Sequence, residues 1–256
     1  MSQPEPAPDP AAAPAYPQAI HLHPTAPLAE RVLLPGDPGR ALAFAQTLLV
    51  KPLMFNHHRG LWGYTGPAVA DGEPLTIQST GMGGPSAAIV LTELISLGAR
   101  RLIRTGTCGA LAPDLALGDL VVARESICAD GTSRALGAGE RVAADRMLAE
   151  ALLRAARSQV GSSMRRVHAG AVVSVDLFYD SFARNHPADA LAIEMEAASL
   201  FAVGTAASVP VACVLAVTDT FEGNEPHPPT RTRIDDDALL VASEAMGAVA
   251  VAALSV

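Results

Sequence analysis

The stretch that decides the fold runs from Arg31 to Leu49 and reads RVLLPGDPGRALAFAQTLL. It begins with the short apolar run Arg31–Leu34, which predicts a strand, and then passes through a turn rich in proline and glycine. The segment Arg40–Leu49 follows with apolar residues at helical spacing. A strand, a tight turn and a helix in immediate succession are typical of an α/β domain.

The same alternation continues to the end of the chain. The further predicted strands are Leu53–His58, Leu75–Ser79, Arg101–Arg104, Leu120–Ala123, Ala169–Val175 and Val211–Val217. The further predicted helices are Pro85–Leu97, Asp145–Val160, Glu196–Ala207 and Asp235–Leu254. Because several of these strands are apolar on both faces, we predict a single α/β domain with a central mixed β-sheet flanked by helices.

Composition predicts the bounds of this domain in the chain, its location in the cell and the kinds of partner it excludes. The first 18 residues contain six prolines and predict a disordered tail, which leaves residues 19–256 for the domain. The net charge of −8 argues against a nucleic acid as the main partner. The three cysteines show no zinc spacing, so we expect no metal site. We find no secretory signal, and Ser243 and Glu244 interrupt the most apolar stretch, Ala238–Val256. We therefore expect a cytoplasmic protein without a membrane span.

Polar residues gather at the predicted strand ends. Gly36, Arg104–Thr107, Asp176 and Asp219 each follow an apolar run that predicts a strand. In open α/β sheets the ligand sits at the carboxyl ends of the strands, so we predict that these residues surround a ligand.

Two of these motifs suit an anion. The turn at Gly36 can bring backbone N–H groups close to an anion, with Arg40 adding a fork of donors, although a plain turn with a solvated arginine is an alternative. Arg104 and Thr107 can reach one oxyanion from the same segment. The alternative for Arg104 is a salt bridge to a buried carboxylate, because an unpaired buried charge is very costly.

Two further motifs suit a sugar and a leaving group. In Ile193–Ala198, a carboxylate of Glu194 or Glu196 can accept hydrogen bonds from adjacent sugar hydroxyls, although acids at a helix start are common for dipole reasons. Asp219, which follows Thr218, is a candidate general acid, and a turn or N-cap aspartate is the alternative.

Four motifs occur in one order: PGDPGRA from Pro35, STGMGGPS from Ser79, RTGTCGAL from Arg104 and EMEAAS from Glu194. In this order they resemble the nucleoside phosphorylase family that includes the hexameric bacterial purine nucleoside phosphorylases and the uridine phosphorylases. The resemblance covers the chain from about Ile20 to its end. Each motif alone is suggestive, whereas the ordered combination is highly specific.

The resemblance implies a role for each matching residue. Phosphate is bound at Gly36, Arg40, Arg104, Thr105, Gly106 and Thr107, and by Arg59 of a neighbouring subunit. The nucleoside is bound by Phe178, Glu194, Met195, Glu196 and Thr218, and by His21 of the neighbour, with His23 as a competitor for that role. Asp219 is the catalytic acid, assisted by Arg231 or Arg233.

The resemblance also implies inorganic phosphate as co-substrate without a further cofactor, and a hexamer built as a trimer of dimers with shared sites. Uridine phosphorylases typically carry a glutamine–arginine pair in an insertion after the aromatic motif, whereas Asp180–His186 has neither feature. They also usually have a glutamate where this chain has Gly60. We therefore predict phosphorolysis of purine nucleosides, with uridine phosphorylase as the alternative.

Three other functions are weaker. A methylthioadenosine or adenosylhomocysteine nucleosidase has no need of the arginines at 40, 59 and 104. A non-catalytic nucleoside-binding protein has no need of the acid at position 219. A nucleotide-cofactor enzyme of the Rossmann type would carry the G-x-G-x-x-G fingerprint, which this chain lacks.

Overall fold

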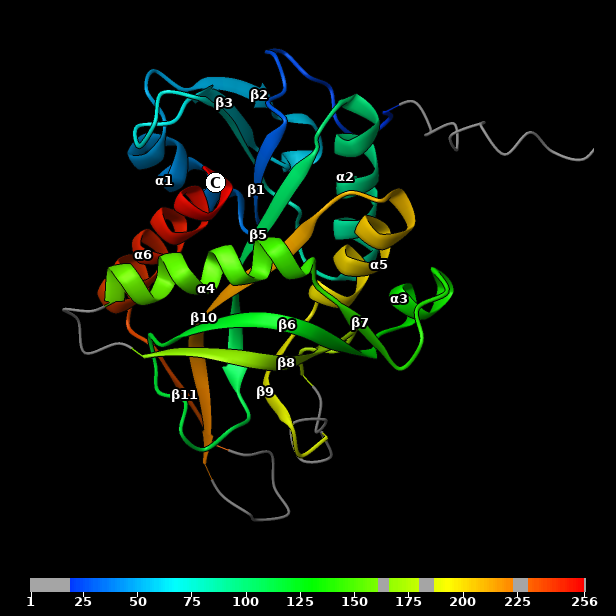
Figure 1. Ribbon diagram of the computed structural model, residues 1–256, viewed down its shortest axis with the longest axis vertical. Coiled ribbons are helices and arrows are strands. Elements are labelled where there is room, and N and C mark those ends of the chain that lie inside the picture. The colour runs from blue at the N-terminus through cyan, green and yellow to red at the C-terminus, as the bar shows by residue number, and fades with distance from the viewer. Residues whose placement is uncertain (1–18, 161–165, 180–186, 223–229, 256) are drawn as a thin grey trace, which may run out of the picture.

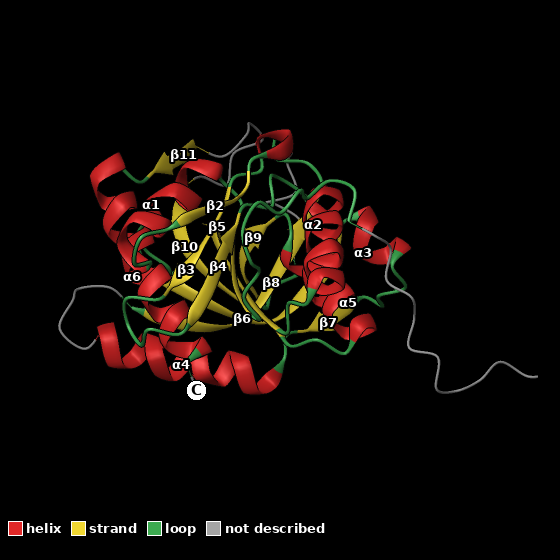
Figure 2. Ribbon diagram, turned by 90° about the horizontal axis from the view of Figure 1, so that it is seen from above, coloured by secondary structure: helices red, strands yellow, loops and turns green. Residues whose placement is uncertain are grey.

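The computed structural model describes residues 19–160, 166–179, 187–222 and 230–255 of the chain. The predicted disordered tail 1–18 and the segment Asp180–His186 lie outside these residues. The rest forms one α/β domain with a mixed sheet between two groups of helices, so the predicted fold class is confirmed (Figures 1 and 2).

Eleven strands of the described residues join in one sheet. They are β1 (Arg31–Pro35), β2 (Leu53–Asn56), β3 (Gly63–Pro67), β4 (Pro74–Gln78), β5 (Arg101–Ala110), β6 (Leu120–Ala129), β7 (Arg141–Ala143), β8 (Val167–Val175), β9 (Ala190–Glu194), β10 (Val211–Glu222) and β11 (Thr230–Arg233).

The middle of this sheet closes on itself. Strand β5 pairs with β10, β10 with β6, β6 with β8, β8 with β9, and β9 again with β5. Strands β1, β4, β3 and β2 continue the sheet from the start of β5, while β7 extends β6 and β11 extends β10. Within this ring β5 pairs with β10 and β9, which come from distant parts of the chain, so the strands that carry Arg104, Asp219 and Glu194 are direct neighbours.

Two groups of helices cover the sheet. The helices are α1 (Pro38–Leu48), α2 (Gly84–Leu97), α3 (Gly131–Ala135), α4 (Arg146–Val160), α5 (Ala197–Ala207) and α6 (Asp236–Leu254). Helices α1 and α4 both pack against α6, whereas α2, α3 and α5 pack against one another on the other side (Figure 2). A short 3₁₀ turn, η1, spans His58–Gly60.

Helix α1 begins two residues before its predicted start at Arg40. Asp37 is its N-cap and accepts a 2.8 Å hydrogen bond from the backbone N–H of Gly39, and Pro38 occupies the first turn. Both residues favour a helix start, so the turn that leads out of β1 is also the cap of α1. Arg40 therefore lies in the first helical turn.

Among the described residues, α6 alone is long and apolar enough to match the dimensions of a membrane span. It packs against α1, α4, β5 and β10, and it buries Met246, Val249 and Leu254 among other side chains. Half of its apolar stretch is covered by the rest of the chain. These contacts identify α6 as a core helix of the domain.

Two predicted strand ends are wrong in a way that matters for the site. Strand β5 continues through Gly106 to Ala110, and β10 continues past Val217 to Glu222. Arg104 therefore lies in the interior of its strand rather than at its end, and Asp219 lies inside a strand rather than after it. A glycine normally weakens a strand, but at Gly106 an added Cβ would lie 2.7 Å from the Arg104 guanidinium carbon, so the glycine makes room for a neighbouring side chain.

The other differences concern short elements. The predicted strand Leu53–His58 ends at Asn56, because the residues at positions 59 and 60 adopt left-handed φ angles of 58° and 70°. Strand β6 extends beyond its predicted end at Ala123 to Ala129. Five short elements were not predicted: α3, β3, β7, β9 and β11.

Candidate active site

Arg104 is buried at the centre of the site, on β5. Its Nε donates a 3.1 Å hydrogen bond to Glu194 Oε2, and its Nη2 donates to Glu196 Oε2. Burial acts to lower the pKa of Arg104, but the charges of Glu196 and Glu194 outweigh burial and raise the pKa above its usual value. Two of the three guanidinium nitrogens thus hold acidic partners, as one of the two sequence interpretations predicted.

The third nitrogen of Arg104, Nη1, is buried and has no hydrogen-bond partner among the described residues. It lies beside the Gly36 turn, where a Cβ added to Gly36 would be 3.9 Å from Nη1 and 3.2 Å from the carbonyl oxygen of Gly81. An unpaired buried cationic donor is costly unless a ligand satisfies it. The arrangement therefore suits an anion bound between Gly36 and Arg104.

A second guanidinium, that of Arg40, belongs to the same region. Burial lowers the pKa of Arg40, and the positive charge of Arg104 lowers it further, while Asp37 opposes the change. Two arginines close enough to repel each other gain most from an anion placed between them. Of the other predicted phosphate residues on β5, Thr105 is buried with no hydrogen bond to its hydroxyl among the described residues, and Thr107 is half-buried.

Glu194 and Glu196 are both buried, and Glu194 accepts hydrogen bonds from more groups of the chain than Glu196 does. Glu194 accepts from Arg104, from the Ser174 hydroxyl, and from the backbone N–H groups of Glu196 and Ala197 at 2.9–3.0 Å. Burial raises the pKa of the Glu194 carboxyl. Glu194 thus fixes the start of α5 and one edge of Arg104.

Glu196 connects a third segment to the site. One oxygen accepts from Arg104, and the other accepts from the backbone N–H of Gly83 at 2.5 Å. Gly83 has a left-handed φ of 84° and lies in the glycine-rich segment that begins at Ser79. This contact was not predicted from the sequence. The half-buried Met195 lies between the two acids.

Asp219 lies on β10 at an irregularity in its pairing with β5. The side chain is 10% exposed, and Oδ2 accepts a 2.8 Å hydrogen bond from the Thr218 hydroxyl. Oδ1 has no hydrogen-bond partner among the described residues. Strand β11 places two arginines near it, with the Nε atoms of Arg233 and Arg231 lying 3.5 Å and 3.8 Å from Oδ1. Asp219 is thus a shielded carboxyl with one oxygen left for a ligand.

Arg231 lies between two aromatic rings. Its guanidinium carbon is 4.3 Å from the centre of the Phe178 ring and 5.3 Å from that of Phe221. The Phe221 ring in turn covers Gly109, where an added Cβ would lie 2.8 Å from the ring. Phe221 was missed in the sequence, and its contact with Gly109, 112 positions earlier in the chain, has no local sequence signal.

His21 and Arg59 lie apart from this group, and no hydrogen bond or ion pair of the described residues links either to Arg104 or Asp219. His21 Nδ1 lies 2.7 Å from Glu93 Oε1, on α2. Arg59 is exposed in η1. The ring of His23 stacks on His58 with ring centres 3.9 Å apart.

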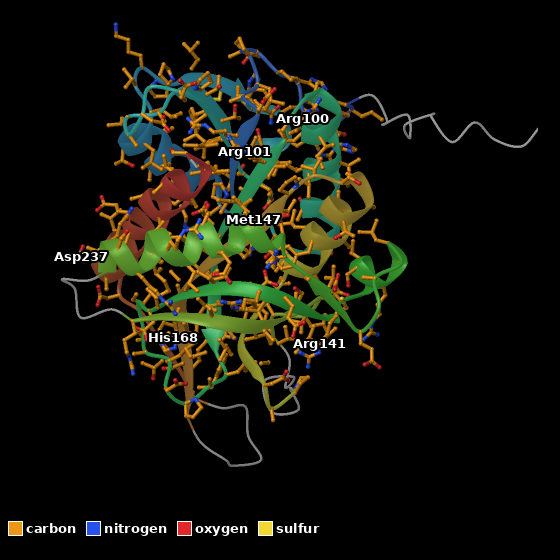
Figure 3. The ribbon with its side chains drawn as sticks, viewed as in Figure 1. Arg100, Arg101, Arg141, Met147, His168 and Asp237 are labelled. Carbon is orange, nitrogen blue, oxygen red and sulfur yellow. The ribbon has the colours of Figure 1, made fainter. Side chains whose placement is uncertain are left out.

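Two charged clusters elsewhere pair within the chain. Figure 3 shows Arg141 and His168 on the lower part of the sheet, near β7 and β8. Arg141 pairs with Glu125 and Asp189, and His168 Nε2 lies 3.0 Å from Asp119. Within the described ranges no group of three or more histidine, cysteine or acidic side chains could hold a metal ion. The candidate site therefore remains the group around Arg104 and Asp219.

The chain belongs to the phosphorylase superfamily, whose family model matches residues 30–255. It is similar to several curated purine nucleoside phosphorylases of the DeoD type. It is 35% identical over 229 residues to that of Geobacillus kaustophilus, which covers 86% of this chain and 94% of the relative. The identity is 36% over 203 residues to that of Clostridium novyi, covering 77% and 85%, and 36% over 223 residues to that of Listeria welshimeri, covering 85% and 94%. The family predicted from the ordered motifs is confirmed.

Proposed function

We propose that this chain is a purine nucleoside phosphorylase, which uses inorganic phosphate to cleave the bond between a purine and its ribose or deoxyribose. The observation that carries the proposal is the buried, unpaired Nη1 of Arg104 beside the Gly36 turn. A hydrolase would have no use for such a donor, because water needs no buried cation to bind it. Phosphate is an anion and needs a cationic donor to bind it in a buried site, and Arg40 supplies a second cation nearby.

The remaining phosphate contacts follow from the same geometry and from the family resemblance. Gly36 leaves its backbone accessible, Gly106 makes room for the Arg104 guanidinium, and Thr105 and Thr107 belong to the same stretch of β5. Arg59 acts in the site of a neighbouring subunit, which agrees with its exposure on its own chain.

The nucleoside lies between the phosphate and Asp219. Glu196 binds the sugar hydroxyls, with Met195 and Thr218 beside it, and Glu194 holds Glu196 and Arg104 in place. Phe178 is half-exposed and offers a ring face to the base. His21 of a neighbouring subunit reaches the 5′-hydroxyl.

The reaction requires the site to stabilise the charge that develops on both sides of the breaking bond. Positive charge develops on the ribose, and the phosphate anion stabilises it before capturing the anomeric carbon. Negative charge develops on the leaving base, and a protonated Asp219 neutralises it at purine N7. Of the two candidate assistants, we assign Arg231, because it is held between aromatic rings, whereas the Arg233 side chain is 75% exposed.

Purine specificity is supported by Asp219 as a base-side acid and by the DeoD-type relatives, which are named for purine nucleosides. We further propose a cytoplasmic homo-hexamer, a trimer of dimers, that needs no cofactor besides phosphate as co-substrate. In that assembly Arg59 and His21 complete the neighbour's site, so an isolated monomer is inactive. A fully active monomer by light scattering would contradict this arrangement.

The test is release of free base from inosine, adenosine and uridine, each with and without inorganic phosphate. We expect phosphate-dependent release from the purine nucleosides. Release from uridine alone would assign the enzyme to pyrimidines and leave Asp219 without its role. Release that does not depend on phosphate would make the enzyme a hydrolase and would overturn the role of Arg104.

A further inference from the structure

One buried carboxylate binds several groups of the segment that precedes β1. Glu93 lies on α2, and its side chain is 6% exposed. It accepts hydrogen bonds from the backbone N–H groups of Ile20, His21 and Leu22 at 2.8–3.0 Å. Figure 1 shows this first blue segment passing beside the upper end of α2. A carboxylate that binds three successive backbone donors fixes the path of that segment.

The same carboxylate also binds the side chain of His21. Glu93 Oε1 lies 2.7 Å from Nδ1 of the ring. A carboxylate can only accept, so the proton of a neutral His21 must be on Nδ1. The other nitrogen, Nε2, is then left with its lone pair, and among the described residues it has no hydrogen-bond partner. Glu93 therefore decides both where the ring lies and which kind of hydrogen bond it can make.

His23, the competing residue, is already engaged. Its Nε2 lies 3.1 Å from the carbonyl oxygen of Ile20, and its ring stacks on His58. A ring held in this way by its own chain is poorly placed to reach another subunit. The stacking of His23 on His58 therefore favours His21 for that role.

We propose that Glu93 is a positioning residue that makes His21 an acceptor for the 5′-hydroxyl, so that the enzyme favours nucleosides with a free 5′-hydroxyl over 5′-deoxy and 5′-thioether nucleosides. This inference rests on the proposed function, in which His21 acts at the ribose of a neighbouring subunit. A 5′-hydroxyl can donate to Nε2, whereas a 5′-methyl or thioether group has no proton to donate. Substrates without that proton leave the acceptor unpaired when the site closes around them.

The test compares kcat/KM for inosine and 5′-deoxyinosine in the assembled enzyme. We expect the wild type to favour inosine by roughly tenfold or more, the range expected for one hydrogen bond to an aligned partner. Two variants separate positioning from general damage. His21→Asn keeps a donor near the Nδ1 position for Glu93 but has no atom at Nε2. Glu93→Gln keeps the shape of the side chain but turns one acceptor into a donor facing the backbone N–H groups.

Both variants should bring the two substrates to within about threefold of each other, mainly through loss of inosine activity. Thr25→Val is the matched control, because the Thr25 hydroxyl also ties this segment to the chain, through Met54 O at 2.7 Å, without touching His21. It should keep the wild-type preference.

Each other outcome has a distinct meaning. Equal use of both substrates by the wild type would overturn the role of Glu93 and His21 and leave the proposed phosphorylase intact. A Glu93→Gln enzyme with reduced activity but unchanged preference would show that Glu93 only stabilises the segment. No phosphorolysis of either substrate by the wild type would contradict the proposed function itself, and this inference with it.

Discussion

Arg231 and Phe178 are in cation–π contact, with the guanidinium carbon 4.3 Å from the ring centre. The two residues are more than fifty positions apart; the resemblance implied that Phe178 binds the nucleoside and that Arg231 or Arg233 assists Asp219. The same guanidinium carbon lies 5.3 Å from the centre of the Phe221 ring. Such a contact restricts a long side chain that would otherwise sample many rotamers. It places one cation near Oδ1 of Asp219, with Arg231 Nε at 3.8 Å.

This contact predicts unequal roles for the two arginines of β11. Arg233→Gln should lower kcat by less than about threefold, since its side chain is 75% exposed and an exposed ion pair contributes little. Arg231→Gln should lower kcat at least about tenfold, because a preorganised charge beside the leaving group is lost. Steady-state kinetics with inosine measures both. Equal losses would show that the stack on Phe178 does not select the catalytic arginine.

Asp219 predicts a loss that depends on the leaving group. Asp219→Asn cannot transfer a proton, so kcat for inosine should fall by roughly 10²- to 10⁴-fold. A purine methylated at N7 already carries a positive charge and needs no proton to leave. The variant should therefore retain most of its activity on 7-methylinosine. An equal loss on both substrates would mean that Asp219 serves folding or binding instead of proton transfer.

Gly106 predicts a specific effect on phosphate. In Gly106→Ala the new Cβ would lie 2.7 Å from Cζ and Nη2 of Arg104, so the guanidinium must move. We expect KM for phosphate to rise by about tenfold or more, because small displacements of a binding group cost much of its interaction. Gly139→Ala is the matched control, since nothing lies within 4 Å of its added Cβ. A Gly106→Ala enzyme with unchanged KM for phosphate would contradict the placement of the anion at Arg104.

The sequence was sufficient to predict the fold class and the family. Apolar runs and helix spacing predicted the main strands and helices, and the motifs indicated Arg104, Glu196 and Asp219 as candidate site residues. The predicted end of β5 was wrong because Gly106 was interpreted as the residue that ends the strand. At Gly106 the reason for the glycine is the Arg104 side chain, which no local pattern reveals.

The contacts that complete the site are long-range. The Glu196 carboxylate binds the Gly83 backbone 113 residues away, and Glu93 binds His21 at a separation of 72 residues. Such pairs depend on how the sheet closes and where the helices pack, and neither is encoded in a short window of sequence. The same holds for the place of Phe221 over Gly109. Motifs therefore selected candidate residues for the site, whereas the structure was needed to show which contacts position them.

Away from the site, a bidentate pair joins β1 to the loop before β4. Arg31 Nη1 lies 2.7 Å from Asp71 Oδ2, and Nη2 lies 3.1 Å from Oδ1. Ser255, just after α6, donates to the same carboxylate. Hydrogen bonds from Arg31 and then Ser255 hold the pKa of Asp71 well below its usual value. The pair thus connects the first strand, a surface loop and the end of the chain.

Asp71→Asn should therefore destabilise the protein in a pH-dependent way. Because the pKa of Asp71 is lower in the folded state, its contribution is present in full above the unfolded pKa of about 3.9 and is lost as the pH falls through the folded value. We expect the variant to lose about 1–2 kcal/mol of unfolding free energy at pH 7, with a smaller difference from wild type below about pH 4. Denaturant unfolding at several pH values measures this difference. Glu140→Gln is the control, because the exposed Glu140 side chain has no ion pair among the described residues and should show no such trend. A difference that stays constant down to pH 2 would mean that the charge of Asp71 contributes nothing and that only its shape matters.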